Sequence, residues 1–181
     1  MKKMVILVFY MIKLIIEIYA WARKFWDKPK PVTDAALENT FKINNMYEFS
    51  KIINNYSYVF DGIRGLIDKT ESAEHFFDKD IKYGRDCDDW ARMWSYWGLY
   101  NNYKPTEYIV LNPKHPFSTA HVITTLEKDG EFVLCNYSPI KLGFKNIDEI
   151  MEYMKRYSSY KDGLLYVKYR ELTLDDIKNP E

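Results

Sequence analysis

The chain has 181 residues and a formal net charge of zero, from 26 basic and 26 acidic side chains. A hydrophobic content of 47% with 29% charged residues is globular, which excludes a disordered chain. A neutral balance argues against a nucleic-acid partner, because phosphate binding needs excess positive charge. Two cysteines and three histidines exclude a disulfide scaffold and disfavour a structural zinc site, so side-chain chemistry must come from few residues.

Residues 4–22 form an apolar segment in which only Lys13 and Glu17 are charged. Its length is close to the roughly 20 residues that a helix needs to span a bilayer. Lys13 and Glu17 are four residues apart, so they can pair on a helix. The polar positions Lys3, Tyr10, Lys13, Glu17 and Lys24 fall on one stripe, which leaves a wide apolar face around the rest of the helix.

Three interpretations of this segment are open. The first is a membrane anchor, spanning or interfacial, and the second is a helix packed on the domain or on a partner with the stripe exposed. The third is a cleaved signal peptide ending near Ala20-Trp21-Ala22, although charges inside the apolar region fit it poorly. We expect residues 1–31 to be a separate helix with a proline linker and residues 32–181 to be the domain. A membrane location and a cytoplasmic one both stay open.

The remaining pattern predicts an α+β domain. Helical spacing covers about residues 34–55, with a break near Asn44 and Asn45, and a short extended segment follows over 56–60. Residues 66–84 are expected to be irregular, with one short helical turn. The last elements are a helix over 86–100, strands over 106–112, 119–127 and 131–137, a helix over 146–157 and a strand over 164–169.

Cys87 lies where the helix over 86–100 should begin, with Asp86 as the expected N-cap. A thiol at a helix N-terminus is near the positive end of the helix dipole, which favours the nucleophilic thiolate. The first amides of the helix, supported by Asp86 and Asp88, could also stabilise an oxyanion. Asp88 and Asp89 would oppose the thiolate unless they face away. The alternative is a structural cysteine buried in an apolar core. Because aspartates flank Cys87, such burial is unfavourable, and we interpret Cys87 as a nucleophile.

His121 is the candidate base, and a hairpin turn at Asp129-Gly130 sets its neighbours. A two-residue turn centred there places His121 opposite Ser138, with Asn136 as the diagonal neighbour on the same face. Cys135 then points to the other face and is structural. A register shift of one residue would reverse these roles. His75 and His115 fall in irregular segments and receive no catalytic role, and Trp90, Trp94 and Trp97 are expected to be core residues.

The run Gly84-Arg85-Asp86-Cys87-Asp88-Asp89-Trp90-Ala91 resembles the nucleophile motif of the transglutaminase-like superfamily. The best match is to the bacterial transglutaminase-like cysteine peptidases. The resemblance covers about residues 56–140 and extends to further positions: Tyr58, Asp61, Gly65, Asp68, His121-Val122 and Phe132–Asn136. It departs from the family at Arg85, which is an extra residue, and at the third triad position, where either Asn136 or Cys135 replaces the family's acid.

The resemblance implies a papain-like fold, in which the helix carrying the cysteine packs on an antiparallel sheet. It implies a triad of Cys87, His121 and Asn136 that transfers an acyl group from a peptide or amide to water or to an amine, with neither metal nor cofactor. The altered third position also suits a second hypothesis, a catalytically lapsed module that binds or assembles, for example in an envelope or viral particle. A cell-wall amidase of another fold is disfavoured, because Asp89-Trp90 follows where a small residue is expected.

Overall fold

The computed structural model describes residues 2–59, 72–80, 85–137 and 141–178. As expected, these residues form an α+β structure around a five-stranded antiparallel sheet in the order β4-β3-β2-β1-β5. The strands are β1 (Lys104–Leu111), β2 (His121–Lys128), β3 (Glu131–Cys135), β4 (Lys141–Phe144) and β5 (Leu165–Glu171).

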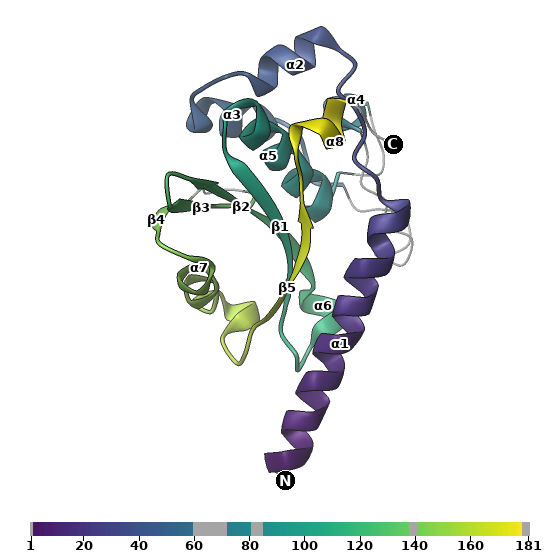
Figure 1. Cartoon of the computed structure of the whole chain (residues 1–181), viewed down its shortest axis with the longest axis vertical. Coiled ribbons are helices and arrows are strands. Elements are labelled where there is room, and N and C mark those ends of the chain that lie inside the picture. The colour runs from purple at the N-terminus through teal and green to yellow at the C-terminus, as the bar shows by residue number, and fades with distance from the viewer. Residues whose placement is uncertain (1, 60–71, 81–84, 138–140, 179–181) are drawn as a thin grey trace.

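Helices cover both faces of the sheet (Figure 1). Alternate side chains of β2 explain this arrangement, because successive residues of a strand point to opposite faces. Leu126 joins the apolar cluster of α5 (Cys87–Tyr100), whereas Ile123 joins the cluster of α7 (Ile147–Met154). Trp90, Trp94 and Trp97 are buried in the α5 cluster, which confirms their expected place in the core.

The helical stretch expected over 34–55 is two helices, α2 (Ala35–Phe41) and α3 (Met46–Ile53). The break falls where the sequence indicates, because the Asn45 side chain accepts hydrogen bonds from the first amides of α3. The short helical turn expected within 66–84 is α4 (Ala73–Phe76), while residues 66–71 and 81–84 lie outside the described residues. In the expected segment 56–60, Val59 forms a bridge with Arg85.

Two short elements, β4 and α6 (Pro116–Thr119), were not predicted from the sequence. Only Phe144 of β4 is buried, so this strand has no alternating pattern to detect. The strand expected over 131–137 ends earlier, at Cys135. The indole N–H of Trp94 donates to the carbonyl of Asn136 (3.2 Å), so that carbonyl is bonded to α5. Two short elements complete the C-terminal region, the 3₁₀ helix η1 (Ser158–Tyr160) and α8 (Leu174–Lys178).

The N-terminal helix α1 (Lys2–Trp26) lies along the edge strand β5 (Figure 1). Ile16 and Ala20 are buried in an apolar cluster with Val167 of β5. Lys13 and Glu17 form the expected ion pair on the helix surface, at 3.8 Å. None of the helices in the described part of the chain has the length and apolar character that a bilayer crossing requires. The domain boundary at residue 31 stays a prediction.

Candidate active site

Cys87 is the first residue of α5, and it is partly buried. Asp86 is the N-cap: its carboxylate accepts from the Asp88 amide at 3.4 Å, and the Asp89 carboxylate accepts from the Asp86 amide at 3.1 Å. The chain that leads into the helix is held by backbone hydrogen bonds in both directions between Arg85 and Val59, each 3.0 Å long. The capping box of Asp86 and Asp89, together with this bridge, holds the Cys87 thiol at the positive end of the helix dipole.

The acidic neighbours of Cys87 have partners of their own. The guanidinium of Arg23, on α1, donates to the Asp88 carboxylate at 2.6 Å, and both side chains are almost completely buried. Asp89 is used in the capping box described above. The positive charge of Arg23 therefore offsets one of the negative charges that would oppose a thiolate at Cys87. No sequence pattern connects Arg23 with this site, because it is separated from Asp88 by 65 positions and belongs to the segment expected to be a separate helix.

His121 and Asn136 are in direct contact, with 2.8 Å between Nε2 of the imidazole and Oδ1 of the amide. The hairpin register confirms the expectation from the turn at Asp129-Gly130, since Thr124 pairs with Cys135 and Lys128 with Glu131. Ser138, expected opposite His121, lies outside the described residues. Cys135 is buried in the α5 cluster, and burial raises the pKa of its thiol well above the ordinary value.

The hydrogen bonds of Asn136 fix the tautomer of His121. The backbone N–H of Tyr137 donates to Oδ1 of Asn136 at 2.8 Å, so that atom is an acceptor. The hydrogen in the bond between Asn136 and His121 therefore belongs to Nε2. Nδ1 of His121 is then the nitrogen that carries the lone pair and can take up a proton.

Two contacts between α5 and β2 show that the helix and the strand run in the same direction. Near the start of α5, the Ala91 carbonyl accepts a hydrogen bond from the Thr124 hydroxyl of β2 at 2.7 Å. Further along, Gly98 lies so close to Leu126 that an added Cβ would be 2.6 Å from the leucine Cδ2 atom. Cys87 and His121, the first residues of these two elements, therefore lie at the same end of the packed pair.

Tyr137 connects the two halves of this end of the fold. Its ring lies 4.9 Å from the His121 ring and 5.8 Å from the Trp90 ring, one helical turn after Cys87. Tyr58 packs edge-on against Tyr137 at 5.2 Å. Burial raises the pKa of both tyrosines, and the electrostatic interaction with Cys87 acts in the same direction. Tyr137 was not predicted as a site residue, although its position directly after Asn136 indicates that it lies close to the candidate triad.

Burial also sets the protonation of the candidate base. It lowers the pKa of His121 below the ordinary value of 6.5, while the hydrogen bond to Asn136 and the charge of Asp88 act in the opposite direction. The net effect favours a neutral imidazole near neutral pH. A neutral imidazole is the form that can accept a proton from a thiol.

The three acidic or thiol groups at the start of α5 could also be considered as metal ligands. Ligand atoms of Asp86, Cys87 and Asp88 all lie within 4.8 Å of one another. Both carboxylates already have partners, because Asp88 is paired with Arg23 and Asp86 caps the helix. The donor set therefore fits a capped nucleophile better than a divalent cation, which would have to displace the buried guanidinium.

Comparisons of the chain with protein-family models, curated proteins and solved structures gave no match. The resemblance to transglutaminase-like enzymes therefore depends on the motifs of this sequence alone. Of the positions that carry it, Asp61, Gly65, Asp68 and Gly84 lie outside the described residues. The structure describes Tyr58, the run from Arg85 to Ala91, His121-Val122 and Phe132–Asn136.

Proposed function

We propose that this protein is a cysteine-dependent acyl transferase or hydrolase of the transglutaminase-like, papain-like kind, acting on a peptide or amide. The observation that carries the proposal is the 2.8 Å contact between His121 and Asn136, at the end of the sheet where α5 begins with Cys87. A nucleophile, a base and a group that orients the base are the three parts that such chemistry requires. The resemblance of the sequence motifs supports the same assignment.

In this proposal, Cys87 Sγ attacks the carbonyl carbon of the substrate, and Nδ1 of His121 takes the thiol proton. The resulting oxyanion is stabilised by the free amides at the start of α5. His121 then gives its proton to the leaving nitrogen, the C–N bond breaks, and a thioester on Cys87 remains. Water or an amine then attacks the thioester carbonyl and gives a proton to His121, and the C–S bond breaks to release a carboxylic acid or a new amide. His121 returns the proton to the thiolate, which restores the thiol. Asn136 holds the imidazole throughout by accepting from Nε2.

Asn136, rather than Cys135, takes the third triad position in this proposal. The amide oxygen of Asn136 is bonded to the imidazole, whereas Cys135 is buried in the core on the opposite side of the strand. An amide can orient an imidazole as well as a carboxylate can, although it adds no negative charge to stabilise the imidazolium. The departure from the family pattern is therefore compatible with activity.

The first experiment measures how fast iodoacetamide alkylates Cys87, followed by mass spectrometry of the intact, folded chain. We expect Cys87 to react well before Cys135, and His121→Ala to slow the reaction at Cys87 by about tenfold or more. Asn136→Ala should slow it less, and Asn136→Asp should restore the rate. His115→Ala is the matched control and should leave the rate unchanged. A rate at Cys87 that does not depend on His121 would contradict the proposal.

A second experiment separates an active enzyme from a lapsed binding module. An activated ester such as p-nitrophenyl acetate should acylate Cys87, and hydroxylamine should remove the acyl group. The acyl adduct should be absent in Cys87→Ala and retained in Cys135→Ala. A folded wild-type protein that gives no adduct at Cys87 would favour the lapsed module and exclude the enzyme.

A further inference from the structure

Helix α1 has an outer face that is apolar and exposed. This outer face consists of residues that are between 41% and 62% exposed: Val8, Met11, Leu14, Ile15, Ile18, Tyr19 and Trp21. At about 100° per residue, they cover an arc of roughly 160°, and between Val8 and Trp21 no charged residue falls within it. Contiguous apolar surfaces of this kind on a soluble protein are typical of binding sites for lipid or protein.

The opposite side of α1 is already used. Ile16 and Ala20 are buried against β5, and Arg23 is buried in its ion pair with Asp88 of α5. The helix is therefore held lengthwise on the domain, and only the outer face and its edges can meet another surface. The first turns of α1 extend past the rest of the chain (Figure 1), so the domain does not cover this end.

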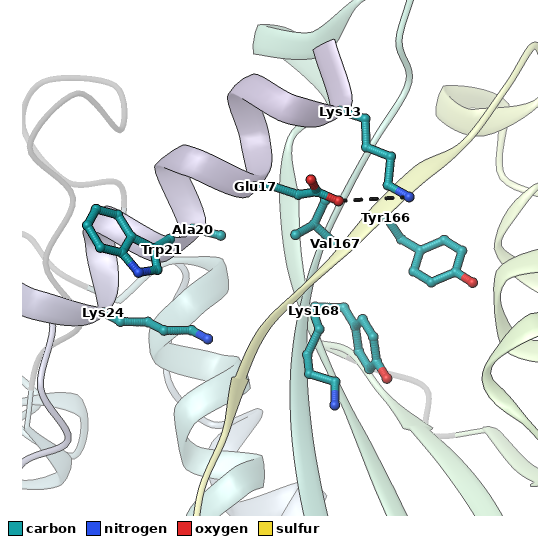
Figure 2. Close-up of a pocket in the computed structure, with 9 residues that line it drawn as sticks. Lys13, Glu17, Ala20, Trp21, Lys24, Tyr166, Val167 and Lys168 are labelled. Atoms are coloured by element: carbon teal, nitrogen blue, oxygen red, sulfur yellow. Dashed lines mark ion pairs between the residues drawn. The ribbon is translucent and has the colours of Figure 1, made fainter. Parts of the chain in front are cut away.

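A cationic pocket lies beside the outer face, between α1 and β5. Its volume is about 450 Å³, and its lining includes three lysines, Lys13, Lys24 and Lys168, and one acidic residue, Glu17. Lys13 pairs with Glu17 at 3.8 Å, and Lys168 pairs at 2.8 Å with Glu171, which is outside the lining. Figure 2 shows Lys24 near Trp21, which lines the pocket and also belongs to the outer face, whereas Lys13 and Lys168 are drawn on the side of β5. The pocket therefore meets the outer face at Trp21, and Lys24 and Lys13 follow about 60° and 80° further round the helix.

We propose that the outer face of α1 binds to the surface of an anionic membrane, with the helix lying parallel to the bilayer. In this arrangement the outer face is buried at the boundary between headgroups and acyl chains, and the long lysine side chains of the pocket extend past the Trp21 edge toward the lipid phosphates. Trp21 and Tyr19, at the two edges of the outer face, are residue types that favour this boundary. The proposal is independent of the acyl-transfer chemistry.

The width of the outer face favours lipid over a second copy of this chain. A two-helix seam needs only a narrow apolar stripe, with charged residues on both sides that select the partner. Here the residues beside such a stripe, Leu14, Tyr19 and Trp21, are themselves large and apolar. A dimer of two such helices would leave these side chains in water, whereas a lipid surface buries the whole arc.

The test is co-sedimentation of the full chain with vesicles of phosphatidylcholine alone or mixed with phosphatidylserine. We expect binding to the mixed vesicles, at least tenfold weaker binding to the neutral ones, and weakening of the binding by salt. Ile15→Ser with Ile18→Ser should reduce binding by at least tenfold. Leu142→Ser with Leu174→Ser removes two exposed apolar side chains elsewhere and should have no effect, as should Cys87→Ala.

Other outcomes would overturn the proposal. An equal loss of vesicle binding in the variant with Ile15→Ser and Ile18→Ser and in the control with Leu142→Ser and Leu174→Ser would indicate non-specific adsorption. Absence of vesicle binding, together with a concentration-dependent dimer that Ile15→Ser and Ile18→Ser abolish, would assign the outer face to a second copy of the chain. Lys24→Glu with Lys168→Glu should remove the preference for anionic vesicles. Inorganic phosphate at millimolar concentration should not displace the protein, and displacement would point to a site for a free anion.

Discussion

Asn136 is held by three hydrogen bonds that come from three different parts of the chain. Its carbonyl accepts from Trp94 of α5, and its side-chain oxygen accepts from the Tyr137 amide and from His121. The amide is therefore oriented by the fold, and the imidazole is oriented by the amide. At the scale of single residues, the candidate base is fixed in position before any substrate binds.

The protonation of His121 provides the first prediction. Because burial lowers its pKa, the imidazole should titrate below 6.5. Between the lowered pKa and pH 6.5, the folded protein then binds fewer protons than the unfolded chain. The contribution of a neutral His121 to the free energy of unfolding is therefore complete above pH 6.5. It is lost as the pH falls through this range. Histidine NMR over a pH series measures this, and His121→Gln identifies the signal. A midpoint at or above 6.5 would be inconsistent with a buried, neutral base.

At the scale of elements, the hairpin of β2 and β3 decides which residue reaches His121. Asp129 and Gly130 have φ angles of 54° and 80°, the left-handed conformation that a two-residue turn between such strands requires. This turn sets the register that pairs Thr124 with Cys135. A slip of one residue would exchange the faces of Asn136 and Cys135 and would remove the orienting amide from the base.

Gly130→Ala tests this turn. A Cβ at Gly130 would meet no atom within 4 Å, so the cost comes from the backbone conformation alone. We expect the free energy of unfolding to fall by about 1–2 kcal/mol, measured by urea denaturation. Asp129→Asn is the matched control, because asparagine tolerates the left-handed region, and it should change stability little. An unchanged free energy of unfolding in Gly130→Ala would show that the left-handed conformation at Gly130 does not limit stability.

At the scale of the whole molecule, buried ion pairs join α1 to the domain. Arg23 of α1 pairs with Asp88, and Asp27 lies 3.6 Å from Arg92 of α5, which in turn pairs with Glu107 of β1 at 2.9 Å. Burial lowers the pKa of Arg92, but the charges of Glu107 and Asp27 outweigh it and raise that pKa well above the ordinary value. The Asp27 carboxylate also accepts from the hydroxyl of Tyr169, on β5. These contacts connect four elements.

Arg23→Gln should therefore destabilise the whole fold. The substitution removes the buried cation beside the Asp88 carboxylate, and breaking one partner of a buried pair costs about 3–5 kcal/mol. It should also slow alkylation of Cys87, because the charge of Asp88 is no longer offset. Lys13→Gln breaks an ion pair on the same helix that is about half exposed, and it should have little effect. Similar free energies of unfolding for the two variants would contradict this role of Arg23.

The sequence alone determined the elements whose signals are local. The N-cap at Asp86, the break at Asn45 and the turn at Asp129-Gly130 each depend on a few neighbouring residues, and each lies where it was expected. The turn also determined the strand register, and with it the approach of Asn136 to His121. The short strand β4 was missed because a strand with one buried residue has no period to read.

The tertiary structure decided what distant segments contribute. From the spacing of its residues, α1 was predicted to be a separate apolar helix. A helical pattern shows which side chains share a face, but it does not show which other element covers that face. Packing decided that one side lies against β5, that Arg23 reaches Asp88, and that the outer face is left exposed. Contacts across 65 positions depend on where the whole chain brings two elements together, and no local pattern encodes them.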